Sequence, residues 1–153
     1  MKRFLSLTFG LIGYLLSQLT LIYAIGFLGN ISVGSDGNMF LLKTVDHPAT
    51  DMATGPAVLI NLVLLGLFAV QHSGMARKEF KNWLTRIVPE HLERTVYVLA
   101  SSLLLILLYW QWQPLPEVVW SVEHPIGSTA LWVLFGAGFA LAVGSTFLID
   151  HFH

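Results

Sequence analysis

A few titratable side chains stand at the borders of long apolar runs, and these are the residues of the sequence that could do chemistry. His72 follows the second apolar run directly. A histidine at an apolar boundary can accept or donate a proton near neutral pH. Glu93 and Arg94 precede the third run, and Asp150 follows the fourth. Proton transfer and charge-assisted binding are therefore the kinds of chemistry to look for.

Most of these residues also have a structural explanation. A histidine at a helix C-terminus and a glutamate at a helix N-terminus both complement the helix macrodipole, which suits His72 and Glu93. Arg94 has a similar explanation, because a long basic side chain at a helix end can extend its charge to the membrane surface. Asp150 fits less well, because a carboxylate at a helix C-terminus costs about 0.3–1 kcal/mol. We therefore expect it to lie near a cation such as Arg77 or Arg94.

Metal and nucleic-acid chemistry are both disfavoured. The sequence has no cysteine, which removes thiolate ligands and cysteine nucleophiles. His151 and His153 flank the end of the last apolar run, but two residues two apart do not share a helix face, so we predict no metal site. The net charge is −1, with 8 basic and 9 acidic residues, and this predicts no nucleic-acid partner.

Composition places these residues in a membrane protein. The sequence has 153 residues, of which 55% are hydrophobic and 11% are charged, against about 25% charged residues in ordinary soluble domains. A helix needs about 20 apolar residues to cross a bilayer. Four runs meet or approach that length: 4–28, 55–71, 95–112 and 126–149. We predict an all-α integral membrane fold with four transmembrane helices in a single membrane domain, 1–153.

The basic residues predict the orientation of these helices. Seven of the eight lie before the first helix or between the second and third, and Lys43 is the exception. Because cytoplasmic loops carry the excess of Lys and Arg, both termini are predicted to be cytoplasmic. Between the second and third spans, residues 75–88 alternate apolar and basic positions at helical spacing until Pro89. They predict an amphipathic helix in the membrane interface.

Small and polar residues within the spans predict helix contacts. Gly136, Ala140 and Gly144 recur every fourth residue, a spacing that lets two membrane helices approach closely. Asn61 and Ser101 are polar groups at membrane depth, so they should face other helices and not lipid. A packing role explains them more simply than a catalytic one. The first loop, 29–54, gives no clear structural pattern.

Four motifs in this order carry a resemblance: FAVQHSGMAR at 68–77, VPEHLERTVYV at 88–98, YWQWQP at 109–114 and LIDHF at 148–152. With them, the sequence resembles the bacterial methanethiol S-methyltransferases. These belong to the nurim-like membrane proteins, which are related to the isoprenylcysteine carboxyl methyltransferases. The resemblance covers nearly the whole sequence.

The resemblance implies a function. Members of that family transfer a methyl group from S-adenosylmethionine to a small thiol and make dimethyl sulfide from methanethiol. The implied location is the bacterial inner membrane, with the lipid bilayer and a small thiol as partners. By analogy, His72 accepts or relays the thiol proton. Glu93, Arg94 and Asp150 would organise the cytoplasmic mouth near the methyl donor.

The sequence also departs from the family. Family members continue beyond the Asp-His-Phe motif with further helices and an Arg-His-Pro element that forms much of the cofactor site, and this sequence has no Arg-His-Pro. We therefore expect a truncated N-terminal part whose cofactor-binding residues lie mostly outside it. A non-catalytic nurim-like scaffold, or a membrane methyltransferase with a lipid or prenylcysteine acceptor, remain as alternatives.

Overall fold

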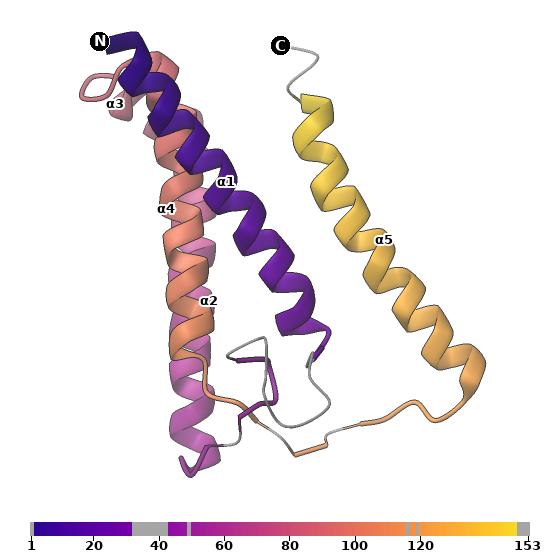
Figure 1. Cartoon of the computed structure of the whole chain (residues 1–153). Helices are drawn as coiled ribbons and strands as arrows, with labels where there is room; N and C mark the ends of the chain where they lie inside the picture. Colours follow the sequence, from indigo (N-terminus) through magenta and orange to yellow (C-terminus); the bar gives the residue numbers. More distant parts are fainter. Residues whose placement is uncertain (1, 32–42, 49, 116, 119, 150–153) are drawn as a thin grey trace. The chain divides into compact units, whose positions relative to one another are not determined.

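The structure is a computed structural model that describes residues 2–31, 43–48, 50–115, 117–118 and 120–149. These residues form five α-helices and no strand (Figure 1). The helices are α1 (Lys2–Leu28), α2 (Thr54–Met75), α3 (Lys78–Leu84), α4 (Glu90–Gln111) and α5 (Pro125–Ile149). The predicted all-helical fold is confirmed for the part of the chain that the structure describes.

Four of these helices are long and apolar enough to cross a membrane. Their apolar segments are Phe4–Leu28, Thr54–Met75, Glu90–Gln111 and Pro125–Ser145. Helices suit such segments because a bilayer offers no hydrogen-bond partner, and a helix satisfies nearly all its backbone groups internally. The prediction of four spans is confirmed, and the chain is a multi-pass membrane protein.

The helix predicted for the membrane interface, α3, is shorter than the range 75–88 that the periodicity predicts. Helix α2 continues to Met75, and Arg77 is extended (ψ 144°), so α3 begins only at Lys78. After Leu84 the chain makes single turns, including the bond from Ile87 N to the Leu84 carbonyl (2.9 Å). Pro89 follows, and a proline disfavours helical geometry in the residue before it. The apolar periodicity therefore continues beyond α3, through the break at Arg77 before it and through the turns after Leu84.

The chain divides into two compact units, Met1–Pro116 and Glu117–His153. In the first unit, α4 packs against both α1 and α2. Thr20 of α1 lies beside Tyr109 of α4, and Ser6 lies beside His91, so α1 and α4 are parallel. Asn61 of α2 lies beside Gln113 and His72 beside Tyr97, so α2 is antiparallel to α4.

This arrangement brings the N-terminus of α1 and the α2–α3–α4 connection to the same end of the first unit (Figure 1). These are the segments that carry seven of the eight basic residues. The positive-inside rule therefore applies consistently to this unit. The cytoplasmic location of that end, and of both termini, stays a prediction.

Residues at the other end of the first unit form a polar network. The Thr44 side chain is fully buried and donates a hydrogen bond to Asn30 Oδ1 (2.5 Å), and Asn30 Nδ2 donates to Asp46 Oδ2 (3.1 Å). Asn30 has a positive φ of 51°, which asparagine tolerates better than most residues. Trp112, which caps the C-terminal end of α4, donates from Nε1 to the Val45 carbonyl (3.1 Å). We call Asn30 and residues 43–47 the loop clasp.

Polar groups within the helices also find partners, as expected. Asn61 is buried and exchanges two hydrogen bonds with the Gln113 main chain, at 2.7 and 2.8 Å. Such reciprocal bonds satisfy an amide that lipid could not. Ser101 faces α2, as predicted, whereas Asn61 bonds to Gln113 just beyond the end of α4.

The second unit contains α5. Within it, the Phe135 ring contacts those of Trp132 and Phe139, with ring centroids 5.5 and 5.0 Å apart. The small residues Gly136, Ala140 and Gly144 lie on this helix. Their role in binding another helix, like the single domain over 1–153, stays a prediction.

Candidate active site

Helices α2 and α4 bring one group of polar and aromatic side chains together. On α2, Phe68 and His72 are four residues apart and share a helix face, and Gln71 adjoins them. On α4, Tyr97 and Ser101 are also four residues apart and face α2. We call these five residues the His72 cluster. All five lie within α2 or α4, so the two packed helices set their positions.

Hydrogen bonds connect the members of the His72 cluster. Ser101 Oγ donates to Gln71 Oε1 (3.3 Å), which can only accept. The Ser101 oxygen lies 3.3 Å from His72 Nδ1 and can accept a hydrogen bond from it in the tautomer that carries its proton on Nδ1. In that tautomer the Nε2 lone pair of His72 is the basic position. The Tyr97 hydroxyl oxygen lies 3.2 Å from Nε2 and 3.0 Å from Nδ1, so it can stabilise either nitrogen.

Two aromatic rings contact the His72 imidazole. The Phe68 ring stacks on it with centroids 5.2 Å apart and planes 22° apart. The Tyr97 ring is tilted by 35°, with centroids 5.4 Å apart. His72 is nevertheless an exposed residue, whereas Ser101 is buried. The imidazole is thus fixed in orientation and remains accessible to a small molecule, so it can exchange a proton with one.

The other candidates lie at the same end or outside the described residues. Glu93 is half-buried in the first turn of α4 and stands four residues before Tyr97, on the same helix face. Arg94 is exposed beside it. Asp150 lies outside the described residues, as do His151 and His153. The structure therefore brings His72 together with Tyr97, and the roles of Glu93, Arg94 and Asp150 stay predictions.

Of the five cluster members, the sequence analysis proposed only His72 as a site residue, and it assigned Ser101 to helix packing. A signal was present: Glu93, Tyr97 and Ser101 repeat every fourth residue along α4. Such spacing aligns polar groups on one face of a helix. What the spacing could not show is that α2, and with it His72, packs against that face. Among the described residues, no group of three His, Cys, Asp or Glu side chains could hold a metal ion.

Comparison with known proteins gives these residues a family context. The chain is 50% identical over 152 residues to a methanethiol S-methyltransferase of Mycobacterium tuberculosis. It is 46% identical over 150 residues to methanethiol S-methyltransferase 1 of Bradyrhizobium diazoefficiens. Methanethiol S-methyltransferases are homologues of this chain. The matches cover 99% and 98% of the chain, so the resemblance seen in the motifs is confirmed.

A more distant relative and the lengths of the relatives complete the comparison. A nurim homolog of Drosophila pseudoobscura pseudoobscura is 29% identical over 148 residues, which is 94% of the chain and 56% of that relative. The chain spans 59% and 50% of the length of the two bacterial methyltransferases. No family model and no solved structure matches the chain.

Proposed function

We propose that this chain is the N-terminal membrane part of a thiol S-methyltransferase of the bacterial inner membrane. The complete protein would use S-adenosylmethionine to convert methanethiol into dimethyl sulfide. The observation that carries the proposal is the His72 cluster, an accessible and oriented imidazole within a chain that is 50% identical to a protein of that name. Its basic end would face the cytoplasm.

His72 would accept the thiol proton. A thiolate is far more nucleophilic than a thiol, so removing this proton activates the acceptor. Proton donation to His72 Nε2 would form an imidazolium, and Ser101 Oγ, 3.3 Å from Nδ1, would accept a hydrogen bond from it. Tyr97 would keep the ring oriented through its hydroxyl. In this proposal His72 is the catalytic base, and Tyr97 and Ser101 are positioning residues.

The residues around His72 fit one end of the methyl donor. S-adenosylmethionine supplies a methyl group on a positively charged sulfonium. Aromatic faces attract cations, and the rings of Phe68 and Tyr97 flank His72. Phe68 and Tyr97 would therefore hold the charged end of the donor. We assign the remainder of the donor site mostly to the part of the complete protein that this chain does not include.

Glu93, Arg94 and Asp150 would organise the cytoplasmic mouth of the site. Glu93 stands one helical turn before Tyr97 on the same face of α4, so in this proposal it would lie between the basic end and His72. Arg94 offers a cation at the same helix end. In this proposal their charges orient polar ligands at the mouth of the site.

The test is a comparison of two histidine variants in the complete protein. General base catalysis contributes about 10²–10⁴-fold, so His72→Ala should lower kcat for dimethyl sulfide formation by about 100-fold or more. His91→Ala is the matched control, because His91 is exposed at the same end and contacts Ser6, outside the cluster. Its kcat should change less than about twofold.

Two results would contradict the proposal. Normal turnover of His72→Ala with methanethiol across the pH range would remove His72 from catalysis. No dimethyl sulfide from the complete wild-type protein, with methanethiol and S-adenosylmethionine both present, would remove the activity itself. In the second case, methylation of a prenylcysteine or lipid would identify another acceptor, and no methylation would favour a scaffold.

A further inference from the structure

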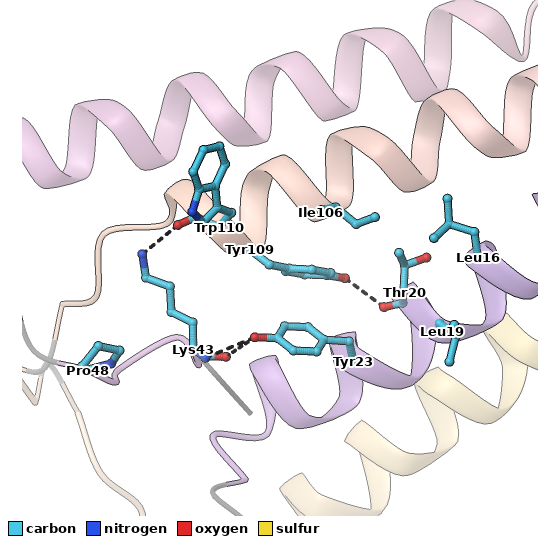
Figure 2. Close-up of a pocket in the computed structure, with 9 residues that line it drawn as sticks. All are labelled: Leu16, Leu19, Thr20, Tyr23, Lys43, Pro48, Ile106, Tyr109 and Trp110. Atoms are coloured by element: carbon cyan, nitrogen blue, oxygen red, sulfur yellow. Dashed lines mark hydrogen bonds between the residues drawn. The ribbon is translucent and has the colours of Figure 1, made fainter. Parts of the chain in front are cut away.

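A cavity at the end of the first unit opposite to the His72 cluster has no part in the proposed reaction. It has a volume of about 540 Å³ and lies between α1, α4 and the segment that contains Lys43 (Figure 2). Sites for small molecules enclose about 300–1,000 Å³. The cavity is therefore large enough for a ligand of that class, or for part of a longer one.

The walls of the cavity are mostly apolar. Leu16 and Leu19 of α1 face Ile106 of α4 across it, and the ring of Tyr109 contributes a further wall (Figure 2). Such walls favour a hydrocarbon chain over a polar ligand, because transferring apolar surface out of water is favourable.

The hydroxyl groups in the walls are already engaged. Tyr109 donates to the Thr20 carbonyl (3.2 Å), Thr20 donates to the Ser17 carbonyl (2.9 Å) and Tyr23 donates to the Lys43 carbonyl (2.8 Å). Each hydroxyl hydrogen is thus used within the protein. A ligand in the cavity would therefore find few hydrogen-bond donors along its length.

Lys43 is different, because it brings a cation to the mouth of the cavity. Its ammonium donates one hydrogen bond to the Trp110 carbonyl (2.9 Å), at the C-terminal end of α4. An ammonium carries three hydrogens, and among the described residues the Trp110 carbonyl is the one acceptor for them. Partial burial desolvates the ammonium and lowers the pKa of Lys43 below its ordinary value. An anion placed there would restore the lost stabilisation.

Charge and shape together indicate one kind of ligand. Lys43 is the single basic residue between Arg3 and Arg77, so this end of the unit has little other positive charge. We propose that the cavity binds an anionic lipid, with one acyl chain between α1 and α4 and the anionic headgroup at Lys43. The two ends of the first unit then have different tasks, proton chemistry at His72 and lipid binding at Lys43.

The test uses Trp110, which lines the cavity. The purified protein is placed in phosphatidylcholine nanodiscs that contain a small fraction of lipid brominated in its acyl chains, a quencher of tryptophan fluorescence. The Trp110 signal is the difference between the protein and its Trp110→Phe variant. Brominated phosphatidylglycerol should reach half of the maximal quenching at an about fivefold lower lipid fraction than brominated phosphatidylcholine. The reason is that one lysine raises the affinity for an anionic lipid by about this factor. A brominated fatty acid, tested separately, shows whether a free carboxylate serves as well as a phosphate.

Two pairs of variants isolate the cause. Lys43→Met should abolish the preference for the anionic lipid, whereas Lys81→Met, at the other end, should keep it. Leu19→Phe should reduce quenching because it fills the cavity, whereas Leu15→Phe should not, because Leu15 is also exposed on α1 and does not line the cavity. These measurements need no methyl transfer, so they can fail or succeed independently of the proposed activity.

Three results would overturn this inference. Equal quenching by the two phospholipids would show that Lys43 does not select an anion. A preference that survives Lys43→Met would place the anion elsewhere. If Leu19→Phe leaves the quenching unchanged, the acyl chain does not enter the cavity. Another protein segment could then occupy it.

Discussion

The His72 cluster and the loop clasp lie at opposite ends of α4 and differ in how their polar groups are held. In the clasp, Thr44 is fully buried, and its hydroxyl bonds to the Asn30 side chain and to the His47 backbone amide. In the cluster, a titratable and exposed residue, His72, is held by bonds of 3.0–3.3 Å. A buried hydroxyl with its partners in place contributes stability, and an accessible titratable group serves chemistry.

The largest expected difference between the two ends is in stability. Thr44→Val keeps the shape of the side chain and removes its hydroxyl, which leaves Asn30 Oδ1 and the His47 amide without that partner. A buried group that loses its partner costs about 1–3 kcal/mol, but Asn30 is half-buried and His47 is exposed, so water replaces part of the lost bonding. The free energy of unfolding of the purified protein in mixed micelles should fall by about 1–3 kcal/mol.

Thr8→Val is the matched control, because Thr8 is exposed on α1 and its hydroxyl bonds only to the Phe4 carbonyl of the same helix. It should change the free energy of unfolding by less than about 0.5 kcal/mol. A similarly small change for Thr44→Val would mean that the clasp does not stabilise this end of the unit.

A smaller effect, and one on activity, is expected at the other end. Tyr97→Phe keeps the ring against His72 and removes the hydroxyl at 3.0 and 3.2 Å from its nitrogens. If Tyr97 positions the imidazole, kcat of the complete protein should fall about tenfold, which is about 1.4 kcal/mol, and the pH profile of kcat should shift. The free energy of unfolding should change by less than about 0.5 kcal/mol.

The control for this variant is Tyr14→Phe, since Tyr14 is about half exposed on α1. Its kcat and pH profile should match those of the wild type. A Tyr97→Phe protein with an unchanged pH profile but lower stability would show that Tyr97 packs the helices and does not tune His72.

The smallest expected effect is the coupling between the two ends. Distant sites with no shared partners usually add within about 0.3–0.5 kcal/mol. The loss of unfolding free energy in the double variant Thr44→Val with Tyr97→Phe should therefore equal the sum of the single losses within about 0.5 kcal/mol. A larger deviation, measured by the same unfolding assay, would show that α4 transmits strain from the clasp to the cluster.

The sequence predicted the helices better than it predicted their contacts. Runs of about 20 apolar residues indicate spans by themselves, since length and composition decide whether a helix can cross a bilayer. The amphipathic segment was predicted too long, because apolar periodicity continues through the turns after Leu84. The loop clasp was not predicted, because it depends on the left-handed Asn30 and on contacts between Asn30 and Asp46, 16 residues apart.

The candidate site was predicted in part. His72 was recognisable because a titratable group at the end of an apolar run is unusual. Ser101 was not, since a serine within a transmembrane segment more often packs against another helix than serves a site. The contact between α2 and α4 places Ser101 Oγ 3.3 Å from His72 Nδ1, so a residue that packs against another helix is also a neighbour of the candidate base.

The sequence by itself determined that this chain forms long apolar helices, and the positions of its basic residues predicted their orientation. Both follow from local composition, because a backbone in lipid must satisfy its own hydrogen bonds. Only the tertiary structure decided that α4 packs against both α1 and α2, with Tyr97 beside a histidine 25 residues away. Such contacts depend on which helix faces meet, and packing between distant segments decides that.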